Sequence, residues 1–347
     1  MSESLDSDIG SDSLEEWPRE LAWENVRAVP SYHWEPWFAQ QVRLQVDAFQ
    51  PDLIAVEIPD LFENAVHEAV ACLPEMTAVW TGSRHLIPIS PEDSIVEALR
   101  LGKERGIPTA CIDLETVVGR DSEGVAGVRG LADPVLLEAM SLQKFIDLNS
   151  EIIRADTPTP ACRKREQNMA YHLRLLSKKY QRILFICGMI HWERIRALLS
   201  SEKPLERLRH EGGHALGLVH VPPPMYFKIT AGLGIPARAL AWEHSRGGRP
   251  FTHLGWLSQV FLGAARELDR SMTPLDLKAF LQYSRHRGIV STNFRRAGMI
   301  VDAAQSIMDE EFGDEVRRQL LTYPWHPDPG KFPFTVGYGM TECAPLI

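Results

Sequence analysis

Three short and almost uninterrupted apolar runs constrain the fold of this chain more than any other feature of its sequence. They are DLIAVEIP at 52–59, IPTACID at 107–113 and RILFIC at 182–187, and a shorter run, VRAV, precedes them at 26–29. A strand needs apolar side chains on both faces when helices cover both sides of its sheet. Because amphipathic stretches separate the runs, the sequence predicts an α/β fold with a mostly parallel central sheet flanked by helices.

The runs VRAV (26–29) and DLIAVEIP (52–59) are separated by about the length of one crossover helix. The intervening stretch has a helical pattern that places four apolar side chains on one face: Phe38, Val42, Val46 and Phe49. A βαβ unit of about 30 residues accommodates this arrangement. The spacing therefore predicts that Val29 and Val56 lie on neighbouring parallel strands.

Proline and glycine punctuate the following segments. Ser90-Pro91 predicts the start of a helix, because serine caps a first turn and proline fits its first position. Gly106 predicts the end of that helix. Asp133-Pro134 predicts the start of another.

From about residue 249 the pattern changes to helix after helix. Thr273-Pro274 predicts a helix start, Gly288 predicts its end, and the next helix has a buried stripe: Ala297, Ile300, Val301, Ala304, Ile307 and Met308. We therefore expect an acidic tail at 1–16, an α/β domain at 17–248 and a helical C-terminal extension at 249–347. This extension would act as a lid or as an interface in a homo-oligomer.

Charge and cysteine content narrow the cellular setting. The chain has 37 Lys plus Arg against 46 Asp plus Glu, a net charge of -9, and no long basic run, which predicts no nucleic-acid partner. Its 5 cysteines are widely spaced and none forms a CxxC motif, as expected of a reduced, cytoplasmic protein. No segment reaches the length of a membrane span, and no GxGxxG, Walker or GxSxG motif predicts a nucleotide cofactor or a serine hydrolase.

Polar residues follow several of the predicted strands. His33, Glu57, Asp113, Arg120 and His191 all come at or after the carboxyl end of an apolar run. Ligands of parallel sheets bind at that edge, so we expect these side chains to meet there. Two imidazoles and two carboxylates can hold a divalent metal that activates water, or act directly as general acid and base. Both alternatives favour hydrolysis of a small-molecule or peptide substrate. The structural alternative is that these residues only cap neighbouring helices or pack in the core.

Five short segments resemble successive motifs of the TraB/PrgY and Tiki families, to which the erythromycin esterase and ChaN families are similar. They are PSYH (30–33), PDLIAVE (51–57), CIDLETVVGR (111–120), KREQNMA (164–170) and FICGMIHW (185–192). The resemblance covers about residues 26–195. It implies a proteolytic or other hydrolytic enzyme, dependent on a metal in Tiki proteins and based on histidine in the esterases.

The resemblance also implies roles for individual residues. Glu57 matches the acidic motif, His191 with Gly188 matches the second GxxH motif, and Arg165 with Glu166 matches an Arg-acidic pair on a helix. Glu57 would be a general base or a metal ligand. Arg165, or Arg120 in its place, would clamp an anionic group.

The first GxxH motif is matched only by its histidine. His33 stands at the expected place, but Pro30 replaces the glycine. By the resemblance, His33 and His191 would be ligands or proton shuttles, and with Glu57 they would hold a divalent metal such as Mn, Co or Zn. The substitution at Pro30 motivates a hypothesis of another class, a binding or signalling module that keeps the fold without catalysis.

A second motif competes for the metal. Residues 210–220 read HEGGHALGLVH and fit HExxHxxGxxH, the zinc pattern of metzincin proteases, whose ligands and general base would be His210, His214, His220 and Glu211. This pattern requires a helix, yet Gly212 and Gly213 would each destabilise one by about 1 kcal/mol. ALGLVHV at 215–221 also reads as a strand, and we favour the strand.

Overall fold

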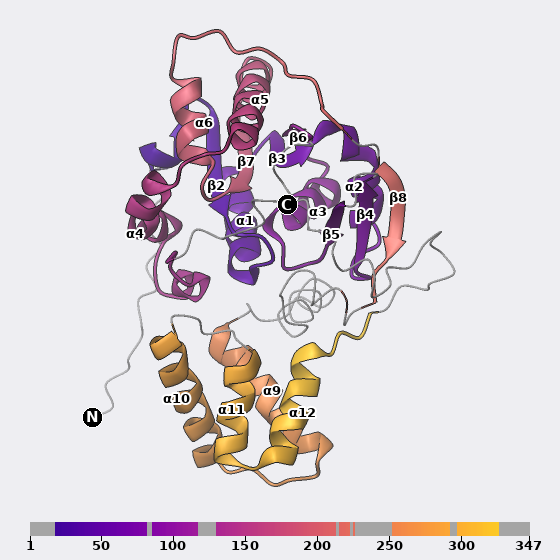
Figure 1. Ribbon diagram of the computed structural model, residues 1–347, viewed down its shortest axis with the longest axis vertical. Coiled ribbons are helices and arrows are strands. Elements are labelled where there is room, and N and C mark those ends of the chain that lie inside the picture. Colours follow the sequence, from indigo (N-terminus) through magenta and orange to yellow (C-terminus); the bar gives the residue numbers. More distant parts are fainter. Residues whose placement is uncertain are drawn as a thin grey trace, which may run out of the picture.

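The computed structural model describes residues 18–81, 85–116, 130–212, 215–222, 225, 252–291 and 297–325. Its larger part is built on a five-stranded sheet with the order β1-β2-β7-β3-β6 (Figure 1). The strands are β1 (Ala22–Trp23), β2 (Val26–Ser31), β3 (Leu53–Pro59), β6 (Thr109–Asp113) and β7 (Ile183–Gly188). All pairs are parallel except β1 with β2. The prediction of an α/β fold with a mostly parallel sheet is confirmed.

The order of the central strands differs from the expectation. Ile186 of β7 pairs in register with Val29 on one side and Val56 on the other, so β7 separates β2 from β3. The prediction that Val29 and Val56 lie on neighbouring strands was therefore wrong. Residues 183–187 of β7 are fully buried, and a central position supplies backbone partners along both edges of such a strand.

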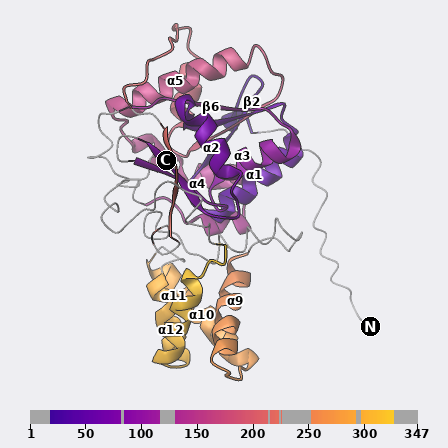
Figure 2. The same cartoon turned by 90° about the vertical axis from the view of Figure 1, so that its right-hand side faces the viewer.

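Helices cover both faces of this sheet. The crossovers through α1 (Pro36–Phe49) and α3 (Ser94–Arg105) move along the sheet in one direction, whereas α5 (Pro160–Leu176) brings the chain back to β7. Right-handed crossovers that run in opposite directions place their helices on opposite faces, and Figure 2 shows α5 across the sheet from α1 and α3. The remaining elements of this part are η1 (Arg19–Leu21), η2 (Asp60–Phe62), α2 (Glu63–Val70), η3 (Pro134–Glu138), α4 (Leu142–Ala155) and α6 (Trp192–Leu199).

The start of α3 lies three residues beyond the predicted start. Asp93, and not Ser90, is the N-cap, because its Oδ1 atom accepts hydrogen bonds from the amides of Ile95 (2.8 Å) and Val96 (3.1 Å). Gly106 ends the helix in the left-handed conformation, as predicted. The start at Asp133-Pro134 is also confirmed, although the element there is the short 3-10 helix η3.

A second, antiparallel sheet has the order β5-β4-β8. It consists of β4 (Thr77–Thr81), β5 (His85–Ile89) and β8 (Ala215–His220). The strand predicted at 215–221 is confirmed, and the zinc helix of the metzincin hypothesis is not formed over these residues. Gly217 has a φ of 127°, which no right-handed helix contains. The first two strands of this sheet were not predicted.

The C-terminal helices pack together as a bundle, which confirms the predicted helical extension (Figure 1). They are α9 (His253–Glu267), α10 (Pro274–Ser291), α11 (Ala297–Ile307) and α12 (Glu310–Leu321). Ile300, Val301 and Ala304 are buried, as the predicted stripe requires. The predicted end of α10 at Gly288 was wrong: the helix continues to Ser291, because glycine lowers helix stability by about 1 kcal/mol without breaking the hydrogen-bond ladder.

Hydrogen bonds and apolar packing between described residues join this bundle to the rest of the chain. The Glu138 carboxylate accepts hydrogen bonds from the Trp37 indole (2.7 Å) and from the His253 amide (2.5 Å) at the start of α9. Beyond α12, the Tyr323 hydroxyl donates to the Pro74 carbonyl. Across the described parts of the chain, no helix combines the length and the apolar character needed to cross a membrane. The predicted tail at 1–16 lies outside the described residues.

Candidate functional site

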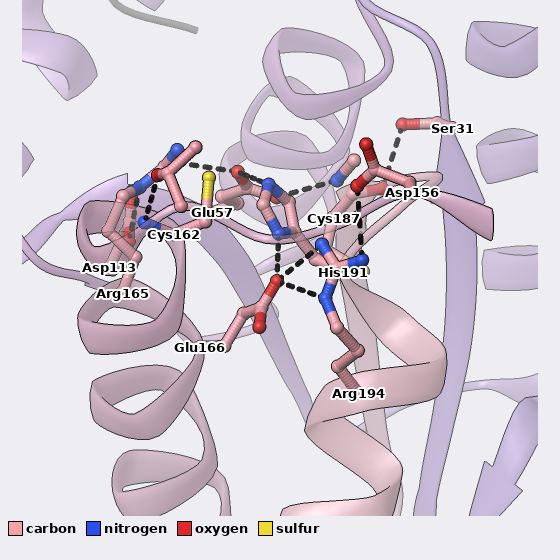
Figure 3. A network of polar contacts seen from close by, with 12 residues as sticks. Ser31, Glu57, Asp113, Asp156, Cys162, Arg165, Glu166, Cys187, His191 and Arg194 are labelled. Carbon is pink, nitrogen blue, oxygen red and sulfur yellow. Dashed lines mark hydrogen bonds and ion pairs between the residues drawn. The ribbon is translucent and has the colours of Figure 1, made fainter. Parts of the chain in front are cut away.

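The carboxyl ends of β3 and β7 bring Glu57 and His191 together (Figure 3). Glu57 is on β3, and His191 follows β7 as the N-cap residue of α6 (Trp192–Leu199). His191 Nε2 lies 3.3 Å from Glu57 Oε1, and the Gly188 amide donates to Glu57 Oε2 at 2.6 Å. The two residues most central to the sequence prediction therefore lie in direct contact at one edge of the sheet.

Glu166 on α5 holds the other nitrogen of the same ring. His191 Nδ1 lies 2.7 Å from Glu166 Oε1, which also accepts a hydrogen bond from Arg194 Nε at 2.8 Å. Arg194 donates in turn to Asp156 at 3.2 Å. Both nitrogens of His191 thus face carboxylates: Nδ1 is within hydrogen-bonding distance of Glu166, and Nε2 lies at ion-pair distance from Glu57.

Arg165, the residue immediately before Glu166 on α5, links Glu57 to Asp113. Its Nη2 atom donates to Glu57 Oε1 at 2.6 Å and to Asp113 Oδ2 at 2.7 Å, and its Nε atom donates to Asp113 Oδ2 at 2.9 Å. Burial lowers the pKa of Arg165, but the charges of Asp113 and Glu57 outweigh it and raise the pKa overall. The guanidinium is therefore a fixed positive charge in the site.

Glu57 is ionised in this environment. Its burial would raise its pKa, but the charges of His191, Arg165 and His33 and the Gly188 amide lower the pKa to about 2. A carboxylate with so low a pKa is a weak base. Its chemical contribution is negative charge held at a fixed place between cationic side chains.

His33 lies two residues beyond the end of β2, the strand next to β7. Its Nδ1 atom lies 3.2 Å from Asp93 Oδ2, which also accepts the Trp34 amide at 3.1 Å. Burial lowers the pKa of His33, but the hydrogen bond and charge of Asp93, with the charge of Glu57, raise it overall. The sequence analysis did not select Asp93, because Ser90-Pro91 predicted an earlier start of the helix. An aspartate before SIVEAL is nevertheless itself a capping signal.

Gly188 allows the close approach of these groups. A Cβ atom at this position would lie 3.2 Å from His191 Cδ2 and 3.4 Å from Glu57 Oε2. The glycine of the predicted second GxxH motif therefore leaves room for the glutamate and the imidazole to meet.

The HEGGHALGLVH residues serve other contacts. His210 Nε2 lies 2.5 Å from Asp60 Oδ1, its Nδ1 atom accepts the Glu115 amide at 3.0 Å, and Glu211 forms an ion pair with Lys164. His220 is on β8, opposite Thr77. The predicted positions His214 and Arg120 lie outside the described residues.

No family model, curated protein or solved structure matches this chain. The relation to the TraB/PrgY and Tiki families stays a prediction.

The predicted metal ligands are already engaged with protein groups. Both oxygens of Glu57 accept hydrogen bonds from Gly188 and Arg165, and both nitrogens of His191 face carboxylates. Among the residues that the structure describes, no group of three or more His, Cys, Asp or Glu side chains is arranged to hold a metal ion. The residues in this arrangement do not fit a metal, so we derive no chemical step through one.

Proposed function

We propose that this chain is a hydrolase of esters or peptides that acts by general acid–base catalysis at the carboxyl edge of its parallel sheet. The observation that supports the proposal is a pair of imidazoles near the shared carboxylate Glu57. His33 is held at Nδ1 by Asp93, which is 0% exposed, and His191 is held at Nδ1 by Glu166, which is 2% exposed. A buried carboxylate fixes the tautomer and orientation of an imidazole for proton transfer.

His33 is the proposed general base. Its side chain is 18% exposed, and its Nδ1–H bond to Asp93 leaves Nε2 as the proton acceptor. The raised pKa of His33 makes Nε2 a stronger base than an ordinary imidazole once it is deprotonated. Water in contact with Nε2 is the proposed nucleophile.

His191 is the proposed general acid. Glu166 holds its Nδ1 atom and its Nε2 atom lies 3.3 Å from Glu57 Oε1, and Arg165 adds positive charge beside the developing oxyanion of the substrate carbonyl. Glu57 therefore has an electrostatic role in this proposal and does not act as the base.

The proposed step is balanced. His33 takes one proton from water as the water oxygen bonds to the carbonyl carbon, and the bond to the leaving alcohol or amine breaks as His191 donates a proton to it. His191 then recovers a proton from His33 through solvent, which restores both groups.

The test is hydrolysis of a panel of p-nitrophenyl esters and peptide p-nitroanilides. We expect turnover by the unmodified chain, loss of turnover in His33→Ala and His191→Ala, and unchanged turnover in the matched control His286→Ala, whose side chain is exposed on α10. No turnover of any panel member would refute the proposal. Activity lost on dialysis against a chelator and restored by Mn²⁺, Co²⁺ or Zn²⁺ would instead favour the predicted metal-assisted hydrolase.

A further inference from the structure

Glu92 and Ser90 are buried polar residues that the proposed chemistry does not use. They lie between β5 and the N-cap of α3, and they are 1% and 0% exposed. Neither the two carboxyl oxygens of Glu92 nor the Ser90 hydroxyl makes a hydrogen bond of normal geometry with any residue in the described part of the chain. Buried polar groups without partners are uncommon in folded proteins and call for an explanation.

The electrostatic surroundings of Glu92 are acidic. Burial raises its pKa to about 8, opposed by the nearby Ser90 hydroxyl and its own amide and reinforced by the charges of Asp93 and Glu35. Tyr323 lies close enough for the charge of Glu92 to act on it, but a phenol supplies no positive charge near neutral pH. The carboxyl group is therefore protonated at neutral pH, and a cation placed beside it would favour the ionised form.

We infer that Glu92 and Ser90 form a subsite for the primary ammonium group of an aminoacyl ester or a peptide with a free amino terminus. Two carboxylate oxygens and one hydroxyl oxygen offer three acceptors, which matches the three N–H donors of an ammonium group. The inference rests on the proposed function, because it names the substrate class of the same site.

The position of Glu92 next to the site supports this assignment. Its neighbour Asp93 holds His33, and consecutive Cα atoms are about 3.8 Å apart. The charge of Asp93 acts on the Glu92 carboxyl group, so an ammonium group on Glu92 would lie in the neighbourhood of the residue that holds the proposed base.

The charge state of Glu92 gives the subsite a measurable property. When the carboxyl group is protonated in the free chain and ionised against a bound ammonium, binding releases one proton per ligand. A neutral N-acetyl group carries no charge to stabilise the ionised carboxylate. Binding of an acetylated ligand should therefore release none.

The experiment is titration calorimetry at pH 7 with L-leucinamide and N-acetyl-L-leucinamide, in buffers of different ionisation enthalpy. We expect leucinamide to bind at least about tenfold more tightly than its acetylated form and with proton release. Glu92→Gln should abolish both differences, whereas Glu68→Gln, a matched exposed glutamate on α2, should keep them. Ser90→Ala, which removes one acceptor, should weaken leucinamide binding without abolishing proton release, and it serves if Glu92→Gln does not fold.

Equal affinity for the two ligands, or leucinamide binding without proton release, would overturn the subsite and leave buried water as the occupant. Binding does not require turnover, so the two proposals fail separately. Leucinamide binding without hydrolysis of any ester or peptide would refute the hydrolase and keep the subsite. Equal hydrolysis of free and N-acetylated aminoacyl esters would refute the ammonium subsite and keep the hydrolase.

Discussion

Two groups of histidines in this chain carry very different amounts of sequence signal. His210 belongs to a contiguous eleven-residue motif, whereas His33 and His191 belong to short segments more than 150 residues apart. In the structure, the dispersed residues converge with Glu57 at the edge of the sheet, and the contiguous motif divides into a loop and a strand. The comparison teaches that a contiguous motif is a weaker guide to the site in this chain than the position of polar residues at the carboxyl ends of parallel strands.

The hydrogen bonds of the two groups explain the difference in function that we propose. The Glu115 amide must donate to His210 Nδ1, so Nε2 carries the proton and donates to Asp60. Both nitrogens of His210 are therefore occupied and its tautomer is fixed. His33 uses only Nδ1 among the described contacts, which leaves Nε2 for chemistry.

The largest expected effect separates the two groups by activity. His33→Ala and His191→Ala should each lower kcat/KM by about 10²- to 10⁴-fold, the range typical of a lost acid or base. His210→Ala should change kcat/KM by less than about threefold, because its ring is saturated by structural contacts. Steady-state kinetics on the best panel substrate measure both, and a larger loss in His210→Ala would reverse the comparison.

Acid stability sharpens the role of Glu57. Its folded pKa of about 2 lies below the unfolded value, so its ionised form contributes about 3 kcal/mol of stability above pH 4.5, and this contribution is lost as the pH falls toward 2. Glu57→Gln should therefore lose stability near neutral pH and show a flatter acid dependence. Urea unfolding between pH 2 and 6 measures this. Glu68→Gln is the control, and parallel pH curves for Glu57→Gln and the unmodified chain would contradict the assigned charge network.

Gly188→Ala tests the spacing at the sheet edge. The added methyl group would lie 3.2 Å from His191 Cδ2 and 3.4 Å from Glu57 Oε2, so one of the two side chains must shift by a few tenths of an ångström. We expect kcat to fall by about tenfold, since small displacements of catalytic groups are costly. Gly298→Ala is the matched control because its Cβ would meet nothing within 4 Å. Equal activities of the two variants would show that the close approach is not required.

The smallest expected effect concerns the stability contribution of His210. His210→Ala removes two hydrogen bonds from a partly exposed ring and should lower the free energy of unfolding by about 1 kcal/mol. Urea unfolding at pH 7 checks this value. A fall as large as that of Glu57→Gln would show that the two groups do not differ in their structural importance.

Much of the fold could be predicted because strands β2, β3, β6 and β7 are mainly apolar runs followed by polar residues. Glu57, Asp113 and His191 follow from that pattern alone. Strand order could not be predicted, because the pairing of Ile186 with both Val29 and Val56 depends on contacts between distant segments. Strand β4 has only three consecutive apolar residues, Ala78, Val79 and Trp80, and Pro88 interrupts β5, so neither segment stands out as a strand.

The partners within the site were harder to predict than its members. Nothing in the sequence around Arg165 indicates that it would join Glu57 to Asp113, because this contact needs α5 to cross the carboxyl end of the sheet. Asp93 acts both as a helix cap and as the partner of His33. A cap is visible in sequence, whereas its second contact appears only when β2 is placed beside β7.

The insertion of β7 between β2 and β3 has a consequence for synthesis of the protein. A nascent chain that has not yet emerged through Gly188 presents two open strand edges where the middle of the sheet will be, and open edges invite pairing with other chains. Strand β7, which fills this gap, begins at Ile183 and is therefore synthesised more than 120 residues after β3 ends at Pro59. Any truncation before β7 should therefore yield a fragment that aggregates.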